Sequence, residues 1–262
     1  MKNIKARIKQ ISPQILLDCM RKVKLLFKKS SYIGTFTEFG DVKYEGVWED
    51  DHWLEISRLK LENLPDNIDG YRSVIFSIID NMSIEETCKV LDFGGGTGFI
   101  YHSIRSFFTN KENVYWDIVD NERLISIGKK YSNKNPNIGF FISLPNINSH
   151  YDVVYMNTTL QYIENYQEVL LKLKKYEPKY FVFTRLLAGN IDTFITCQNI
   201  NGKKIPCMFL NINELIFFME KNNYKLFKRI PCIEESFAKS SFKKIPSGKQ
   251  IKNSVNIIFC QK

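Results

Sequence analysis

The stretch V-L-D-F-G-G-G-T-G, residues 90–98, decides the fold class. Its first four residues predict a short buried strand that carries Asp92, and residues 99–108 have the spacing of a helix. Glycines between a strand and a helix let the main chain turn with positive φ and approach a ligand closely. In an open α/β sheet, nucleotide-like ligands bind in the crevice outside the carboxyl ends of the strands. The stretch therefore predicts an α/β fold with such a ligand beside Asp92.

The spacing of the glycines indicates the kind of ligand. A dinucleotide fingerprint needs a third small residue, but counting from Gly94 places the bulky Phe99 there. The pattern Asp-x-Gly-x-Gly-x-Gly fits instead, over Asp92, Gly94, Gly96 and Gly98. It resembles motif I of the class I S-adenosylmethionine-dependent methyltransferases. The resemblance implies S-adenosylmethionine as the cofactor, and a glycine-rich turn without a ligand is the plain alternative.

Strands and helices alternate beyond the glycine loop, as they do in that superfamily. A second strand, 114–119, ends at Asp120, whose carboxylate can accept hydrogen bonds from both ribose hydroxyls. Further strands are expected at 138–142, 151–156 and 180–184, with a helix at 164–175. Segments 194–197 and 208–210 look like strands, and 213–221 like a helix. A late antiparallel hairpin, 224–230 with 255–260, completes the superfamily's plan. We predict a doubly wound, mostly parallel, seven-stranded sheet with an N-terminal helical extension.

The candidate cofactor site gathers around these strand ends. Its members are expected to be Asp92, Phe93, Gly94, Gly95, Gly96, Gly98, Asp120 and Asn157. No metal is expected, because His52, His102 and His150 are scattered along the chain. His102, in the first helix after the glycine loop, is ranked as a structural residue.

Four residues are candidates for catalysis. Gln161 and Tyr162 follow the fourth strand and are expected to face the transferred methyl group, although a tyrosine with a pKa near 10 is a poor base. Arg185, after the fifth strand, either binds a carboxylate or phosphate in bidentate fashion or forms an internal salt bridge. His52 is the group best suited to proton transfer near neutral pH. It lies in an aromatic and acidic segment, 44–53, which is interpreted either as a lid over the site or as an anchored surface loop.

Further motifs narrow the resemblance. The chain combines five features: L-D-F-G-G-G at 91–96, T-L-Q-Y at 159–162, Arg185, F-I-T-C-Q at 194–198 and F-L-N-I-N-E-L at 209–215. They resemble a family of bacterial methyltransferases encoded in surface-polysaccharide (O-antigen or capsule) gene clusters. The resemblance implies O-methylation of a sugar, nucleotide-sugar or other small anionic precursor. A noncatalytic scaffold or binding protein of the same fold, within a polysaccharide assembly complex, is the alternative.

Other methyltransferase classes fit less well. Nucleic-acid amino-methylases place Asn/Asp-Pro-Pro-aromatic after the fourth strand, where this chain has Asn-Thr-Thr-Leu at 157–160. The Pro-Cys pairs at 206–207 and 231–232 come too late for a cytosine-carbon methylase. Only one glutamate, Glu164, lies where arginine methylation would need two. A hydroxyl acceptor is therefore favoured, partly by elimination.

Charge and composition suggest the setting. Residues 1–30 contain nine Lys or Arg and one acid, and residues 225–262 contain nine and two, so the two ends carry net charges of +8 and +7. Because the whole chain has a net charge of +9, residues 31–224 carry about −6. A basic stripe on the active face, typical of nucleic-acid enzymes, is not expected. Residues 13–29 predict an amphipathic basic helix, lying on an anionic membrane surface or packed on protein. The six cysteines form no C-x-x-C pair, and no signal peptide is evident, so a cytoplasmic protein is expected. If the helix at 13–29 binds lipid, the protein is expected at the inner membrane surface. Two parts are predicted, 1–70 with the basic helix and lid segment, and 71–262 with the cofactor-binding domain.

Overall fold

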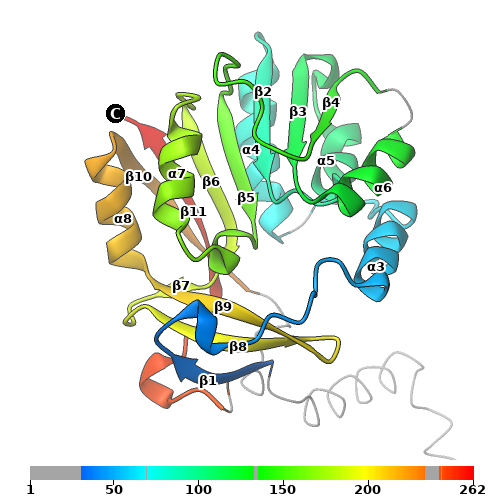
Figure 1. Cartoon of the computed structure of the whole chain (residues 1–262). Coiled ribbons are helices and arrows are strands. Elements are labelled where there is room, and N and C mark those ends of the chain that lie inside the picture. The colour runs from blue at the N-terminus through cyan, green and yellow to red at the C-terminus, as the bar shows by residue number, and fades with distance from the viewer. Residues whose placement is uncertain (1–30, 69, 133–134, 234–241, 243) are drawn as a thin grey trace, which may run out of the picture.

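The core of the protein is a large twisted sheet (Figure 1). The computed structural model describes residues 31–262 apart from 69, 133–134, 234–241 and 243, so the expected helix at 13–29 lies outside the described residues. Within this part, seven strands lie in the order β10-β11-β6-β5-β2-β3-β4. Their bounds are β2 Cys88–Phe93, β3 Val114–Val119, β4 Ile138–Phe141, β5 Val153–Asn157, β6 Tyr180–Leu186, β10 Tyr224–Cys232 and β11 Ser254–Gln261. Strands β2 to β6 pair in parallel, and β10 and β11 join one edge as an antiparallel hairpin. The predicted seven-stranded, doubly wound sheet is confirmed.

Helices cover both faces of this sheet. Their bounds are α4 Gly70–Ser83, α5 Phe99–Ile104, α6 Glu122–Ser132, α7 Tyr166–Lys174 and α8 Ile212–Lys221. Successive side chains of a strand point to opposite faces of the sheet, as β5 shows. Val153 and Tyr155 pack in the hydrophobic cluster with α4 and α5. Val154 and Met156 pack in the cluster with α7 and α8 on the other face. Figure 1 shows α7 and α8 in front of the sheet. Because both faces are buried, the strands read as continuous apolar runs.

A second sheet of four strands lies beyond the carboxyl edge of the first, in the order β1-β8-β9-β7 (Figure 1). Its strands are β1 Tyr32–Phe36, β7 Ala188–Gly189, β8 Phe194–Ile200 and β9 Lys203–Asn211. The apolar segments predicted as strands near 194–197 and 208–210 form the hairpin of this sheet. Strand β1, which the sequence analysis does not predict, pairs antiparallel with β8.

Helix α3, Asp51–Glu62, begins inside the segment expected to be a lid or loop. The Asp50 side chain caps it by accepting a hydrogen bond from the His52 N–H at 3.1 Å. Leu54, Ser57 and Leu61 form its buried face. Short 3₁₀ turns complete the described part: η1 Phe39–Asp41, η2 Arg105–Phe107, η3 Lys111–Asn113, η4 Leu160–Tyr162 and η7 Ser247–Lys249. No helix among the described residues is long and apolar enough to cross a membrane.

This arrangement determines where a ligand can bind. Strand β2 pairs with β3 on one side and with β5 on the other, so the chain order reverses at β2. The glycine loop after β2 therefore lies at the topological switch point of the sheet. The four-stranded sheet and α3 lie beside the same edge (Figure 1).

Candidate functional site

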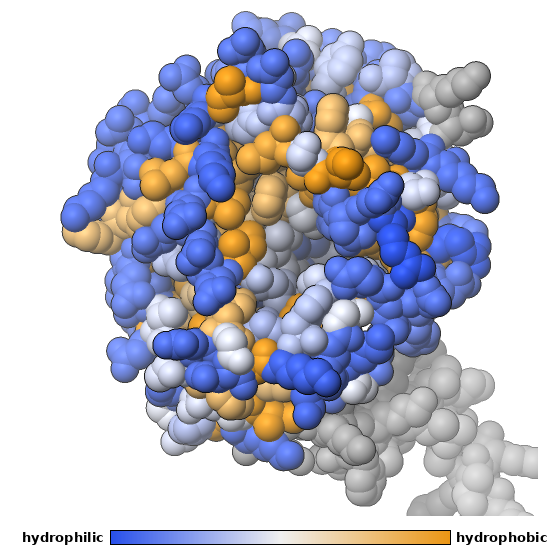
Figure 2. Space-filling view, in the orientation of Figure 1, coloured by the Kyte–Doolittle hydropathy of each residue, from blue (hydrophilic) through white to orange (hydrophobic). Residues whose placement is uncertain are grey.

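A cavity of about 560 Å³ opens at the carboxyl edge of the core sheet. Figure 2 shows this face of the molecule hollowed between the core and the four-stranded sheet, with hydrophilic side chains around much of the rim. Its walls are formed by the loops after β2, β3 and β5, by the carboxyl end of β6, and by α3, α5, α6 and β8. Its lining residues are Trp48, Trp53, Ser57, Lys60, Gly94, Gly95, Gly96, Thr97, Phe99, Ile100, Asp120, Leu124, Asn157, Thr158, Thr159, Tyr162, Ile163, Arg185, Gln198 and Ile200.

The glycine loop is packed on the protein side and open on the cavity side. A Cβ on Gly94 would lie 2.3 Å from the Thr159 side chain, and one on Gly95 would lie 2.5 Å from the Asp92 carboxyl carbon. Gly96 has φ +61°, and a Cβ there would meet no atom within 4 Å. The backbone at Gly96 therefore faces open space, as a loop that approaches a ligand requires.

Asp120 stands beside Gly96 at the end of β3. Its Oδ2 accepts the Gly96 N–H at 2.7 Å, and its Oδ1 accepts the Asn121 N–H at 2.7 Å and the Asn121 side-chain amide at 3.0 Å. Burial raises the Asp120 pKa, and these hydrogen bonds oppose the shift. A carboxylate offers about four acceptor positions, so Asp120 retains acceptor capacity toward the cavity.

Asp92 lies beneath the loop, fully buried. The Trp116 indole donates to its Oδ2 at 3.0 Å, while its buried Oδ1 has no hydrogen-bond partner among the described residues. Burial raises its pKa to about 7, with a further contribution from the Asp120 charge. Asp92, Phe93 and Gly98, all predicted to bind cofactor, are not among the lining residues. Gly94, Gly95, Gly96, Asp120 and Asn157 are.

Of the four catalytic candidates, Tyr162 and Arg185 line the cavity. The Tyr162 hydroxyl donates to Gln198 Oε1 at 2.7 Å, and burial raises its pKa well above the ordinary value. Tyr162 is therefore suited to orienting groups rather than to accepting a proton. The Arg185 guanidinium lies 4.9 Å from the centroid of the Tyr71 ring.

The other two candidates lie elsewhere. Gln161 is 1% exposed and does not line the cavity. His52 is exposed on the first turn of α3, also outside the lining. His102 packs on α6, with its Nε2 2.9 Å from Ser132 Oγ, and burial lowers its pKa to about 4. A neutral, packed imidazole agrees with the structural role expected for His102.

Two residues at the same edge have a strained backbone. Thr158 has φ 57° and Arg185 has φ 56°. Asn157 of β5 pairs with Thr184 of β6, and the two strained residues are the next ones along each chain segment. The left-handed region costs L-residues about 1–2 kcal/mol. Asn157 Oδ1 accepts from Thr184 Oγ1 at 3.1 Å and from Thr158 Oγ1 at 3.3 Å, which ties the strained loops together. Strain of this kind clusters at ligand sites.

The sequence analysis did not identify the contribution of α3 to the cavity. Trp53, Ser57 and Lys60 all line it from this helix. The local signals for a helix are present, because Asp50 is a capping residue and Leu54 and Leu61 have helical spacing. No local pattern indicates that α3 packs beside the core sheet.

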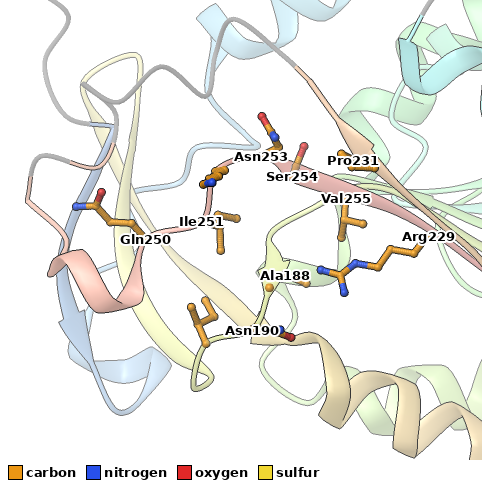
Figure 3. A pocket seen from close by; sticks show the side chains of 12 residues that line it. Ala188, Asn190, Arg229, Pro231, Gln250, Ile251, Asn253, Ser254 and Val255 are labelled. Atoms are coloured by element: carbon orange, nitrogen blue, oxygen red, sulfur yellow. The ribbon is translucent and has the colours of Figure 1, made fainter.

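A second, smaller cavity of about 280 Å³ lies between β7, β10 and the segment that leads into β11. Figure 3 shows the Arg229 side chain pointing into it, toward Ala188 and Asn190. None of the residues predicted for cofactor binding or catalysis lines it. The larger cavity is therefore the candidate site.

Comparisons with known proteins agree with this geometry. No protein-family model and no curated protein sequence matches the chain. Among solved structures, the methyltransferase in complex with the Trm112 methyltransferase activator from Haloferax volcanii aligns over 82% of this chain and 96% of its own, with TM-score 0.54 and 10% identity. An S-adenosylmethionine-dependent methyltransferase from Aquifex aeolicus aligns over 81% and 99%, with TM-score 0.51 and 14% identity.

A third similar structure contains the expected cofactor. Magnesium protoporphyrin IX methyltransferase from Synechocystis PCC 6803, with bound S-adenosylmethionine, aligns over 79% of this chain and 91% of its own, with TM-score 0.51 and 8% identity. Identities this low establish the fold and not the reaction. The chain has the fold of the class I S-adenosylmethionine-dependent methyltransferases.

Proposed function

We propose that this protein is a methyltransferase that uses S-adenosylmethionine. The observation that carries the proposal is the pairing of Gly96 and Asp120 at the switch-point cavity. An open glycine backbone and a carboxylate with a spare acceptor position on Oδ2 are groups that suit an amino-acid tail and a ribose. The similarity in fold to S-adenosylmethionine-dependent methyltransferases supports this assignment.

The lining residues fit the cofactor chemically. Asp120 would accept hydrogen bonds from the ribose hydroxyls, and the loop at Gly94–Gly96 would approach the amino-acid tail. Ile100 and Leu124 supply apolar surface for a purine. When bound, S-adenosylmethionine supplies an electrophilic methyl group on a sulfonium.

The acceptor proposed is a hydroxyl of a sugar, nucleotide-sugar or other small anionic precursor in surface-polysaccharide biosynthesis. The resemblance to polysaccharide-cluster methyltransferases supports the setting, and the position of Arg185 in the cavity supports an anion. Tyr162 and Gln198, joined by a hydrogen bond, offer polar atoms that can orient a hydroxyl. Positioning of the reacting groups can supply most of the rate, because the cofactor carries the reactive group.

The proposal is tested by thermal unfolding with S-adenosylhomocysteine, the reaction product. A ligand at a hundred times its Kd adds about 2.7 kcal/mol to the stability of the folded state. We expect the wild-type midpoint to rise, and the rise to be lost in Asp120→Asn. Asp66→Asn, at an exposed acid outside the cavity, should behave as wild type. A methyl-labelled cofactor should then label an acceptor in a pool of sugar phosphates, uronates and nucleotide-sugars. An unchanged wild-type midpoint would contradict the proposal, and an equal rise in Asp120→Asn would place the cofactor elsewhere.

A further inference from the structure

Helix α3 brings a lysine to the part of the cavity lined by Trp48, Trp53, Tyr162 and Gln198, here called the acceptor end. Part of the Lys60 side chain is exposed, while its ammonium lies 5.4 Å from the centroid of the Trp53 ring and borders the cavity. Burial lowers the Lys60 pKa, and repulsion from Arg185 lowers it further. Lys60 and Arg185 both line the cavity.

Among the described residues that line the cavity, the cationic side chains are those of Lys60 and Arg185. Among the described lining residues the only carboxylate is Asp120, and it is already hydrogen bonded to the glycine loop. No ion pair joins Lys60 to any carboxylate of the described chain. An anion held near both cations would relieve their repulsion and raise the Lys60 pKa toward its ordinary value.

Aromatic rings border the same end. Trp48 packs edge-on against Trp53 at 5.0 Å and against Tyr162 at 5.1 Å between ring centroids. The Trp53 indole nitrogen is buried and has no hydrogen-bond partner in the structure. Indole faces are suited to the C–H surfaces of a pyranose, and polar groups such as Gln198 to its hydroxyls.

We propose that Lys60, with Arg185, binds the oxyanion of an acidic sugar acceptor, whose ring lies against Trp53. This inference rests on the proposed methyltransferase function and deepens it by assigning the residue that selects an acidic acceptor. The oxyanion is the carboxylate of a uronate or the phosphate of a sugar phosphate. Lys60 is then a specificity-determining residue of the reaction.

The three tryptophans of the chain allow a direct test by NMR of their indole N–H groups. Trp116 donates to Asp92 beneath the glycine loop and reports on the cofactor end. Trp53 reports on the acceptor end. Single Trp→Phe variants assign the signals, and the protein, saturated with S-adenosylhomocysteine, is titrated with glucuronate, glucose 1-phosphate and glucose.

We expect the Trp53 signal to shift saturably with at least one acidic sugar, and glucose to bind at least about tenfold more weakly, because charge-assisted hydrogen bonds are the strong ones. Lys60→Met should abolish this preference, and Lys60→Arg should retain most of it. Lys130→Met, at an exposed lysine of α6 outside the lining, is the matched control. Whether glucuronate or glucose 1-phosphate shifts Trp53 identifies the oxyanion.

The outcomes separate this inference from the proposed function. If S-adenosylhomocysteine leaves the Trp116 signal unchanged and does not stabilise the protein, the proposed function fails. If Trp116 responds, the inference is overturned by any of three results: equal affinity for glucose and the acidic sugars, no shift of Trp53 with any of them, or an unchanged preference in Lys60→Met.

Discussion

Two carboxylates support the glycine loop, and their surroundings give them different properties. Asp120 accepts three hydrogen bonds and borders the cavity. Asp92 accepts one, from Trp116, and is fully buried. Asp120 is therefore equipped to bind as a charged acceptor, whereas the buried Asp92, with its pKa raised to about 7, is in part protonated at neutral pH.

The raised pKa of Asp92 predicts how stability depends on pH. An acid whose pKa is higher in the folded than in the unfolded protein favours folding when protonated, so this stability is lost as pH rises from about 4 through 7. In Asp92→Asn, which does not ionise, that loss disappears. Between pH 5 and 8 the unfolding free energy of the wild type should fall relative to the variant by roughly 3 kcal/mol.

Urea unfolding of both proteins across this pH range measures the difference. A difference in unfolding free energy between the two proteins that is the same at every pH reflects only the substitution itself. A difference that does not change between pH 5 and 8 would contradict the raised pKa of Asp92.

At the residue scale, the sequence predicted the groups that follow strands and missed those that depend on packing. Gly96, Asp120 and Arg185 could be assigned to the sheet edge because each follows an apolar run. Lys60 could not, because its position depends on where α3 packs. The left-handed backbone at Thr158 was also unforeseen, because threonine rarely adopts it.

Among the elements, residues 42–50, here called the strap, join the two sides of the cavity. In the middle of the strap Glu45 exchanges hydrogen bonds with the backbone of Lys204 on β9, with its N–H donating at 3.0 Å and its Oε2 accepting at 2.8 Å. At the last residue of the strap, Asp50 forms an ion pair with Lys203 of the same strand. Arg123 of α6 donates to the adjacent Glu49 carbonyl and pairs at 2.5 Å with Asp51, the first residue of α3.

The strap predicts an effect of Arg123 on binding without an effect on folding. Arg123→Gln should increase hydrogen exchange at the backbone amides of the strap and weaken acceptor binding, because Trp48 is then held less firmly beside Tyr162. The unfolding midpoint should change little, since exposed ion pairs contribute little to stability.

Arg58→Gln is the control, because Arg58 also forms solvent-exposed ion pairs, with Glu55 and Glu62 within α3. Hydrogen exchange read by mass spectrometry distinguishes the two variants. Equal exchange in the strap of Arg123→Gln and the wild type would show that Arg123 does not hold it.

Elements of the core sheet were predicted within a few residues, because strands buried on both faces are short apolar runs between turn residues. Strands β1 and β7 and helices α3, α4 and α6 were not predicted. Strand β1 pairs with β8, with Tyr32 opposite Gln198, and no local pattern reports a partner so distant in sequence.

Across the whole molecule, the cavity is built by the joining of three parts: the switch point of the core sheet, the four-stranded sheet and α3. The first part was evident from the sequence and supplies the cofactor end. The other two complete the walls of the cavity, with Trp53, Ser57 and Lys60 from α3 and with Gln198 and Ile200 from β8. The chain shares its fold with methyltransferases of low sequence identity, and function resides in sites placed on folds.

The central claim is that the cofactor binds against the open backbone of Gly96. Calorimetric titration with S-adenosylhomocysteine tests it in the wild type, Gly96→Ala and Gly202→Ala. Both glycines have positive φ and open space where a Cβ would lie, but only Gly96 lines the cavity, while Gly202 lies in the β8–β9 turn. We predict that the wild type and Gly202→Ala bind alike and that Gly96→Ala binds at least about tenfold more weakly, because a methyl group would occupy ligand space. Equal affinity in all three proteins, or no binding by the folded wild type, would contradict the account.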